Sequence, residues 1–227
     1  MLLLIGALYV FAMQRNSQRL VQGPEISFSG DNNLFITHAT VSKLLIQNQN
    51  KHSEQPKEMI DLNALESALK SNPHIKQAEV ALSVDGKLSA QIKQRRPIAR
   101  VQAQSAYYLD DEGQPMPLSL NYTARVPVVS GYVNKDSLYE VFKVAKMIDG
   151  DSFLKQHVIA INIQEDQTIA FRIRTYDMTV QLGDATQLYK KINNFKAFYQ
   201  KALKDSILNS YSIVNLKFDK QVICTKK

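Results

Sequence analysis

Tryptophan is absent from this chain of 227 residues, cysteine occurs once, and glycine occurs only eight times. Because Cys224 is alone, an intrachain disulfide is excluded. Its place in an alternating terminal segment favours a small apolar packing residue over a reactive thiol. With few glycines and a hydrophobic content of 44%, the chain can form hydrophobic cores. Domains usually have ~100–200 residues, so this length allows one or two domains.

Recognised catalytic patterns are also missing. The four histidines lack metal-ligand spacing, and the chain holds no Gly-rich phosphate loop, Gly-Xaa-Ser-Xaa-Gly or His-Glu-Xaa-Xaa-His signature. The acidic run Asp110-Asp111-Glu112 ends at Gly113 without the alternating ligands of a calcium loop, which indicates a solvated turn. We therefore expect no enzyme, no cofactor, no bound metal and no small-molecule substrate.

Positive charge is concentrated at the C-terminus. Residues 186–227 contain nine lysines and two aspartates, while the rest of the chain is neutral on balance. We favour a solvated helix face over a nucleic-acid surface for this stretch. The functional alternative is attraction to an acidic partner segment or an anionic lipid surface.

The first thirteen residues carry no charge, but they are fewer than the ~20 residues that cross a bilayer as a helix. One interpretation is a signal peptide cut near Ala12, although no basic stretch precedes the apolar run. We favour the other, the outer part of a transmembrane helix whose start lies before Met1. Arg15 and Arg19 follow the run, which speaks mildly against placing the rest of the chain outside the cell.

Residues 58–101 give the clearest local pattern. Leu62, Leu65 and Leu69 share one helical face, Asp61 or Asn63 can cap that helix, and Asn72-Pro73 ends it. Alternation over 78–84 and 88–93 then predicts two strands, with Val84 facing inward and Asp85-Gly86 as a two-residue hairpin turn. Pro97 predicts that the residues after it form an edge strand or a linker.

Upstream, residues 25–28 indicate a short strand, and Thr37 can cap a helix whose Val41, Leu44 and Leu45 point inward. The polar segment 47–57 predicts a loop between the two helices. The expected order is therefore strand, helix, helix, strand, strand.

The remainder predicts a second domain of strands and helices. Strands are expected at 107–109, 126–129, 158–164, 168–174 and 176–182, and helices at 137–148 and 185–203. Residues 212–218 and 221–225 predict a terminal hairpin around Asp219-Lys220, with Val214, Leu216 and Phe218 on one face. If the chain ends on this strand, its outer edge offers unpaired N–H and C=O groups to a partner's strand.

The order of elements, the short strand ending in Gly30, Asn72-Pro73 and the basic Arg-Xaa-Pro after the last strand resemble the POTRA domain of the bacterial cell-division proteins FtsQ and DivIB. Tyr108–Gly113, Val126–Gly131 and Val214–Phe218 resemble that family's second domain. The chain departs from the family at His74, where an aromatic residue often follows Asn-Pro, and at Gln94, where an acidic residue is common. It also has Asp85-Gly86 in place of Trp-Pro at the hairpin turn.

The resemblance implies an α+β protein with a truncated N-terminal membrane anchor, a POTRA-like βααββ domain, and a mixed or antiparallel sheet domain with flanking helices. The corresponding ranges are 1–23 for anchor and linker, 24–98 for POTRA, and 99–227 for the second domain. It implies a non-enzymatic divisome scaffold in the bacterial inner membrane, single-pass, with its bulk in the periplasm.

The implied partners are FtsB- and FtsL-like proteins, with FtsK-, FtsW- and FtsI-like proteins as further candidates, and no nucleic acid. By resemblance, the residues expected to bind the partner at the C-terminal edge are Leu216, Phe218, Val222 and Ile223. The alternative for these residues is that they close the core, and Lys226 and Lys227 would then protect the edge from aggregation.

Two other functions stay open at this point. A POTRA-bearing factor for outer-membrane protein assembly or secretion would normally carry a barrel of many ~10-residue strands, and too few residues follow position 98 for one. A periplasmic enzyme acting on cell wall would use Asp110, Asp111 or Glu165 as acid or base.

Overall fold

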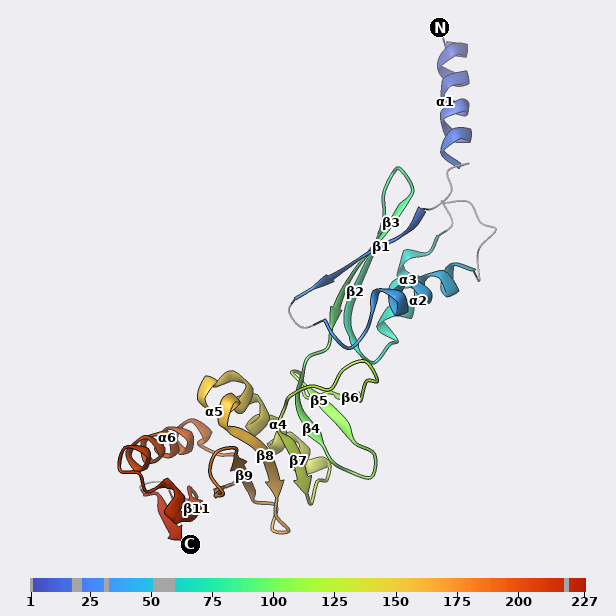
Figure 1. The fold of residues 1–227 in the computed structure, drawn as a ribbon. Coiled ribbons are helices and arrows are strands. Elements are labelled where there is room, and N and C mark those ends of the chain that lie inside the picture. The colour runs from blue at the N-terminus through green and yellow to red at the C-terminus, as the bar shows by residue number, and fades with distance from the viewer. Residues whose placement is uncertain (1, 18–21, 31–32, 51–59, 219–220) are drawn as a thin grey trace. The chain divides into compact units, whose positions relative to one another are not determined.

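The computed structural model describes residues 2–17, 22–30, 33–50, 60–218 and 221–227 (Figure 1). The chain divides into two compact units. The first comprises Met1–Arg95 with Ser119–Tyr122, and the second comprises Arg96–Leu118 with Thr123–Lys227. Both contain helices packed on a sheet, so the expected α+β class is confirmed.

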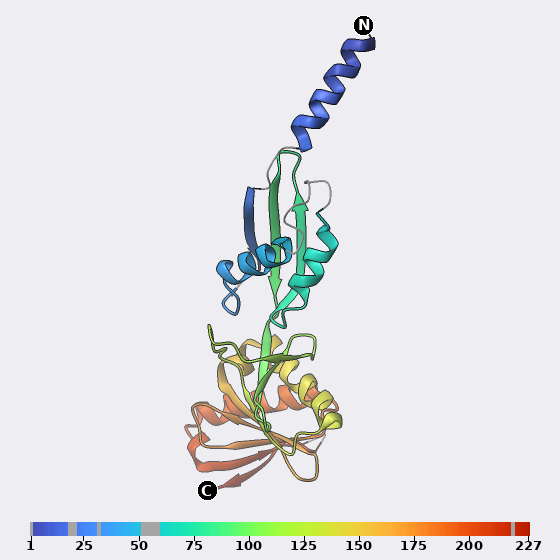
Figure 2. The ribbon, with the colours of Figure 1, turned by 90° about the vertical axis from the view of Figure 1, so that its right-hand side faces the viewer.

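The first unit has the expected order of strand, helix, helix, strand, strand. Its elements are β1 (Gln22–Ser29), α2 (His38–Asn50), α3 (Leu62–Lys70), β2 (Ile75–Leu82) and β3 (Lys87–Gln94). Strand β3 lies in the middle of the sheet, parallel to β1 and antiparallel to β2. The inward faces of α2 and α3 pack on one side of this sheet (Figure 2), so that one apolar core serves the whole unit.

Helices α2 and α3 begin at the capping residues that the sequence predicts. Thr37 Oγ1 accepts a hydrogen bond from Thr40 N at 3.2 Å, and Asp61 Oδ1 accepts one from Ala64 N at 3.0 Å. Each cap satisfies an amide that the first turn cannot pair internally. Helix α2 continues to Asn50, so the predicted loop was wrong for residues 47–50, and residues 51–57 lie outside the described part.

The β2–β3 turn differs from the predicted two-residue turn. Ser83 N donates to Lys87 O at 2.9 Å, and Gly86 N donates to Ser83 O at 3.0 Å, which leaves a three-residue loop. Only Gly86 takes a positive φ, of 91°, whereas the predicted turn needs two such residues. Val84 consequently lies in the loop and is 84% exposed, so its predicted inward position was wrong.

Gln94 holds the segment that leads into α2. Its Oε1 accepts from Phe35 N at 3.0 Å and Ile36 N at 3.3 Å, while its Nε2 donates to Ile36 O at 3.0 Å. The side chain is buried, with 8% exposed. The amide thus meets two donors and one acceptor of the same backbone segment, which requires both an oxygen and an N–H group.

The second unit is built on one nine-stranded sheet with the order β12-β11-β10-β9-β8-β7-β4-β5-β6. Its strands are β4 (Pro97–Val101), β5 (Tyr107–Asp110), β6 (Pro115–Pro117), β7 (Val128–Gly131), β8 (Val158–Ile163), β9 (Ile169–Ile173), β10 (Thr179–Gly183), β11 (Tyr211–Asn215) and β12 (Ile223–Lys226). Its helices are α4 (Lys135–Gly150), α5 (Ser152–His157), α6 (Leu188–Lys204) and the short 3-10 turn η2 (Leu208–Ser210).

Strand β4 corrects the expectation for Pro97. Instead of an edge or a linker, the segment is an interior strand between β7 and β5. Pro97 is the first residue of the strand, a position that sheets tolerate because the missing N–H lies where the ladder begins. Ile98, Ala99 and Val101 are buried in the core.

The sheet of the second unit has one covered face and one open face. A register row of apolar side chains crosses the covered face: Val129, Ile161, Phe171, Val180, Val214 and Cys224. Helices α4 and α6 pack on this face, with the Phe195 and Phe171 rings 5.3 Å apart. The neighbouring row faces the other way and is more polar: Ser130, Asn162, Ala170, Gln181, Asn215 and Ile223.

The apolar N-terminus forms helix α1 (Leu2–Ser17), and Leu4, Leu8 and Phe11 are each more than half exposed. Among the described residues, none of the helices has the length and apolar character needed to span a membrane.

Candidate partner-binding edge

The C-terminal hairpin is present. Strands β11 and β12 pair antiparallel, with Val214 opposite Cys224 and Asn215 opposite Ile223. On its other side β11 runs parallel to β10, and Leu216 N donates to Gln181 O at 2.8 Å. The connection between the strands is longer than predicted, and its residues 219 and 220 lie outside the described part.

The four residues expected at the binding edge lie in different environments. Leu216 is 2% exposed and belongs to the core, so its side chain packs internally and offers no surface. Val222 is half-buried against the same core. Phe218 and Ile223 are 47% and 42% exposed. The expected shared face of Val214, Leu216 and Phe218 was wrong for Phe218, because β11 ends at Asn215 and the alternation stops there.

Strand β12 forms one edge of the nine-stranded sheet, and in the described residues it pairs only with β11. Ile223 and Thr225 face the open side, while Cys224 faces the core, where burial raises the pKa of its thiol. The edge therefore combines a backbone ladder with apolar side chains on both faces, which is what an added strand requires.

The other sheet edges are protected more strongly. Strand β6, at the opposite edge of the same sheet, begins and ends with proline, which removes two backbone donors. In the first unit, β1 contains Pro24 and an irregular register. On β2, Val80 N donates to Glu66 Oε1 at 3.0 Å, so a side chain of α3 already occupies this edge position. Among the described residues of strand β12, the charged side chain of Lys226 near its end is the feature that protects this edge.

The basic stretch is not simply a solvated face. Lys191 is buried, with 7% exposed, and its Nζ donates to Asp184 Oδ1 at 2.6 Å and to Asp184 O at 2.9 Å. The Lys191 ammonium, and next the Thr186 hydroxyl, hold the pKa of Asp184 at about 2, below its ordinary 3.8. Lys196 pairs with Asp151. Sequence reasoning missed both pairs, because their partners lie outside α6.

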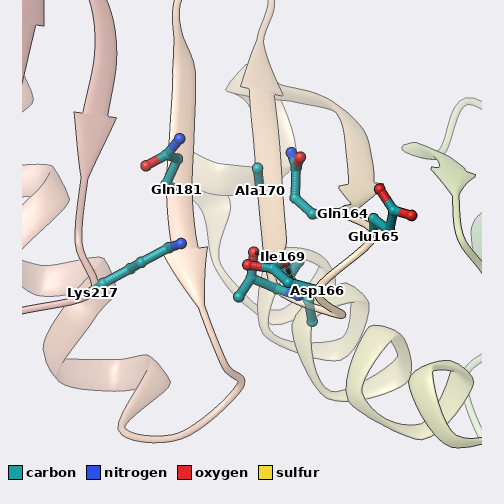
Figure 3. Close-up of a pocket in the computed structure, with 8 residues that line it drawn as sticks. Gln164, Glu165, Asp166, Ile169, Ala170, Gln181 and Lys217 are labelled. Atoms are coloured by element: carbon teal, nitrogen blue, oxygen red, sulfur yellow. Dashed lines mark hydrogen bonds between the residues drawn. The ribbon is translucent and has the colours of Figure 1, made fainter.

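A pocket of about 250 Å³ lies beside Lys217, just after β11 (Figure 3). Glu165 and Asp166 of the β8–β9 turn and Gln181 of β10 also line it. Hydrogen bonds from the Thr168 hydroxyl and then its backbone N–H lower the pKa of Asp166. The pocket thus presents a cation, carboxylates and an amide, and its volume lies below the ~300–1,000 Å³ of pockets that hold drug-sized molecules.

The three residues considered as acid or base of an enzyme, Asp110, Asp111 and Glu165, do not form one site. Asp110 is buried and accepts hydrogen bonds from Glu112 N at 2.9 Å and Gln114 N at 2.8 Å, as a turn-forming aspartate does. Asp111 lies 3.8 Å from Arg96 in an ion pair. Glu165 lines the pocket beside Lys217. Among the described residues, no three His, Cys, Asp or Glu side chains gather as a metal site would require.

Comparison with known families decides the identity of the fold. Residues 25–93 match the model of the POTRA-like domain. Residues 96–225, more than half of the chain, match the model described as FtsQ/DivIB, C-terminal related. The chain belongs to the FtsQ/DivIB family. No curated protein matches it closely enough to count as a relative.

Membership of the FtsQ/DivIB family confirms the resemblance drawn from the sequence. The two domains indicate a scaffold role in cell division and interactions with other divisome proteins. FtsQ/DivIB proteins are typically membrane-anchored. The FtsQ/DivIB-related domain coincides with the nine-stranded sheet, and the edge strand β12 lies near its end.

Proposed function

We propose that this FtsQ/DivIB-family chain is a non-enzymatic divisome scaffold that recruits an FtsB- or FtsL-like partner by strand addition at β12. The observation that carries this proposal is the edge of β12, the least protected sheet edge among the described residues, beside two exposed apolar side chains, Phe218 and Ile223. In strand addition, backbone hydrogen bonds supply affinity and alternate side chains supply selectivity.

The proposed site consists of Phe218, Val222 and Ile223, with Leu216 as core support. An added strand would pass Ile223 on the open face of the sheet and Val222 on the helix-covered face. The pocket beside Lys217 would accept one polar side chain of the partner. We further assign residues 1–23 to an anchor and linker, 24–98 to the POTRA domain and 99–227 to the second domain, with the bulk of the protein in the periplasm.

Charge substitutions at the edge test the proposal. We expect Ile223→Glu and Phe218→Glu to weaken co-purification of an FtsB/FtsL-like partner at least about tenfold, the equivalent of ~1.4 kcal/mol, because a charge would be buried against the added strand. Ile46→Glu is the matched control, since Ile46 of α2 is also 42% exposed. Equal capture by Ile223→Glu and the unchanged protein would refute the assigned edge.

A C-terminal deletion provides a second test of partner capture at β12. Removing residues 212–227 would also remove Val214 and Leu216 from the core and so confound binding with folding. Removal of residues 222–227 keeps both, and we expect it to abolish capture while the far-ultraviolet circular dichroism stays close to that of the full chain.

A further inference from the structure

Strand β2 is an outer strand of the three-stranded sheet in the first unit. In its ladder with β3, Val80 lies opposite Ala90, while Val80 N donates to Glu66 Oε1 of α3 at 3.0 Å. The N–H of Val80 therefore points away from β3. Because backbone groups alternate between the two sides of an antiparallel strand, those of Ala78 and Leu82 point the same way. This side of β2 thus carries a backbone ladder with which another strand could pair.

The carboxylate of Glu66 is held at this edge by two donors. Glu66 lies on α3, whose Leu65 and Leu69 are buried in the core and hold the helix against the sheet. Its second oxygen, Oε2, accepts a hydrogen bond from Lys70 Nζ at 3.2 Å. The hydrogen bond from Val80 N, and next that from Lys70, lower the pKa of the Glu66 carboxyl, so the group is ionised at neutral pH. Each oxygen therefore has its own donor, which orients the carboxylate on the β2 edge.

This carboxylate opposes the pairing of a further strand. The N–H of Val80 is the middle one of the three outward amides, so an added strand needs it. That strand would replace a hydrogen bond to a carboxylate with one to a neutral carbonyl, and charge-assisted hydrogen bonds are about twice as strong. It would also cover the Glu66 carboxylate, which would lose water without gaining a donor.

We propose that Glu66 keeps the β2 edge closed to strand addition, so that an extended segment of another protein pairs with the POTRA-like unit only after this side chain is displaced. Strand β2 has the sequence IKQAEVAL and contains no proline. The protection that prolines give to β6 is therefore supplied here by a side chain of α3. The proposal does not depend on strand addition at β12, which belongs to the other unit.

The test uses the full chain, isotope-labelled for nuclear magnetic resonance, and a synthetic peptide of sequence KLSAQIKQ as the probe. This is the sequence of β3, which pairs antiparallel with β2 in the fold, and a single strand brings no helix that could collide with α3. Titration with the peptide reports pairing at β2 through the backbone amide signals of Ala78, Val80 and Leu82. In the unchanged protein, these signals should shift little.

Three variants separate the hydrogen bond from the charge. Glu66→Ala removes the acceptor of Val80 N and should let the peptide bind at β2 about tenfold more tightly or better. Alanine favours a helix, so α3 is retained. Glu66→Gln is the matched control, because it removes the same charge but keeps an oxygen that can accept from Val80 N, and its binding should change less than about threefold. Lys70→Met removes the ion pair with Glu66 but keeps the contact with Val80, and it should also change binding little.

Hydrogen exchange of the Val80 amide provides a second measurement. Exchange should be about tenfold faster or more in Glu66→Ala, because the amide loses its acceptor, whereas Glu66→Gln should keep most of the protection. Glu66→Ser, whose side chain is too short to reach Val80, should behave like Glu66→Ala. Far-ultraviolet circular dichroism of all variants should match that of the unchanged protein, which separates opening of the edge from unfolding.

Three results would overturn the proposal. The first is equal peptide binding by Glu66→Ala and Glu66→Gln. The second is faster exchange at Val80 in Glu66→Ala without any peptide-induced shift of the β2 amides. The third is a set of shifts confined to residues 223–226 in every variant, which would place the peptide on β12 alone. None of these outcomes decides whether an FtsB- or FtsL-like partner is captured at β12, so the two proposals fail separately.

Discussion

The buried amide of Gln94 provides a quantitative test of how the POTRA-like unit is held together. Gln94→Leu keeps a similar volume but removes the partners of Phe35 N, Ile36 N and Ile36 O. A buried backbone group that loses its partner costs about 1–3 kcal/mol. Three groups lose their partners, and local rearrangement can let water reach some of them. We therefore expect the free energy of unfolding to fall by about 3 kcal/mol or more.

Gln94→Glu separates the acceptor from the donor. A carboxylate still accepts from both amides, but it faces Ile36 O with an oxygen where Nε2 donates at 3.0 Å. We expect a loss of about 1–3 kcal/mol at neutral pH. Protonation restores a donor, so the folded-state pKa of this glutamate should lie above its unfolded value of about 4.3. The variant should therefore regain stability as the pH falls through that raised pKa.

Because the chain has no tryptophan, unfolding in urea is best followed by circular dichroism, and amide hydrogen exchange of residues 33–50 localises the effect. Gln91→Leu is the control, since Gln91 is exposed on the same strand, and it should stay within about 0.5 kcal/mol of the unchanged protein. The reasoning is refuted if Gln94→Leu behaves like Gln91→Leu, or if the deficit of Gln94→Glu does not change with pH.

Two further predictions concern the second unit. Gly131→Ala should cost more than about 3 kcal/mol or prevent soluble expression, since its Cβ would lie 2.1 Å from Ile163 O at a φ of +94°. Gly150→Ala meets nothing within 4 Å and should change the midpoint of thermal unfolding little or raise it. Asp184→Asn should cost about 1 kcal/mol at pH 7, a value reduced for the exposure of Asp184. Because the pKa of Asp184 is about 2, its stabilisation is present above pH 3.8 and lost toward pH 2, where urea titrations of both proteins should converge.

Local sequence was sufficient where the deciding interactions are close in the chain. Asp61 and Thr37 cap their helices through amides three residues away, and alternation of side chains placed β2 and β3. These signals depend on backbone geometry and on the period of a helix or a strand. The same signals located β8, β9 and α6, with ends that differ by a few residues.

The prediction for Pro97 failed because it treated the proline without its neighbours in space. Only the pairing of β4 with β7 and β5 makes the segment an interior strand. Lys191 was expected among solvated lysines, and its burial depends on Asp184 in the preceding loop. Sequence spacing carries no information about such partners, because a long side chain can reach a carboxylate outside its own helix.

The sequence by itself determined the βααββ order, the helix caps, the terminal hairpin and the likeness to FtsQ and DivIB. Tertiary structure alone decided which side chains that hairpin exposes: Leu216 joined the core, while Phe218 and Ile223 stayed accessible. It also decided which edge is least protected, through prolines on β6 and Glu66 at β2. The physical reason is that periodicity reports the local direction of a side chain, whereas burial and edge protection depend on what the rest of the chain brings to that place.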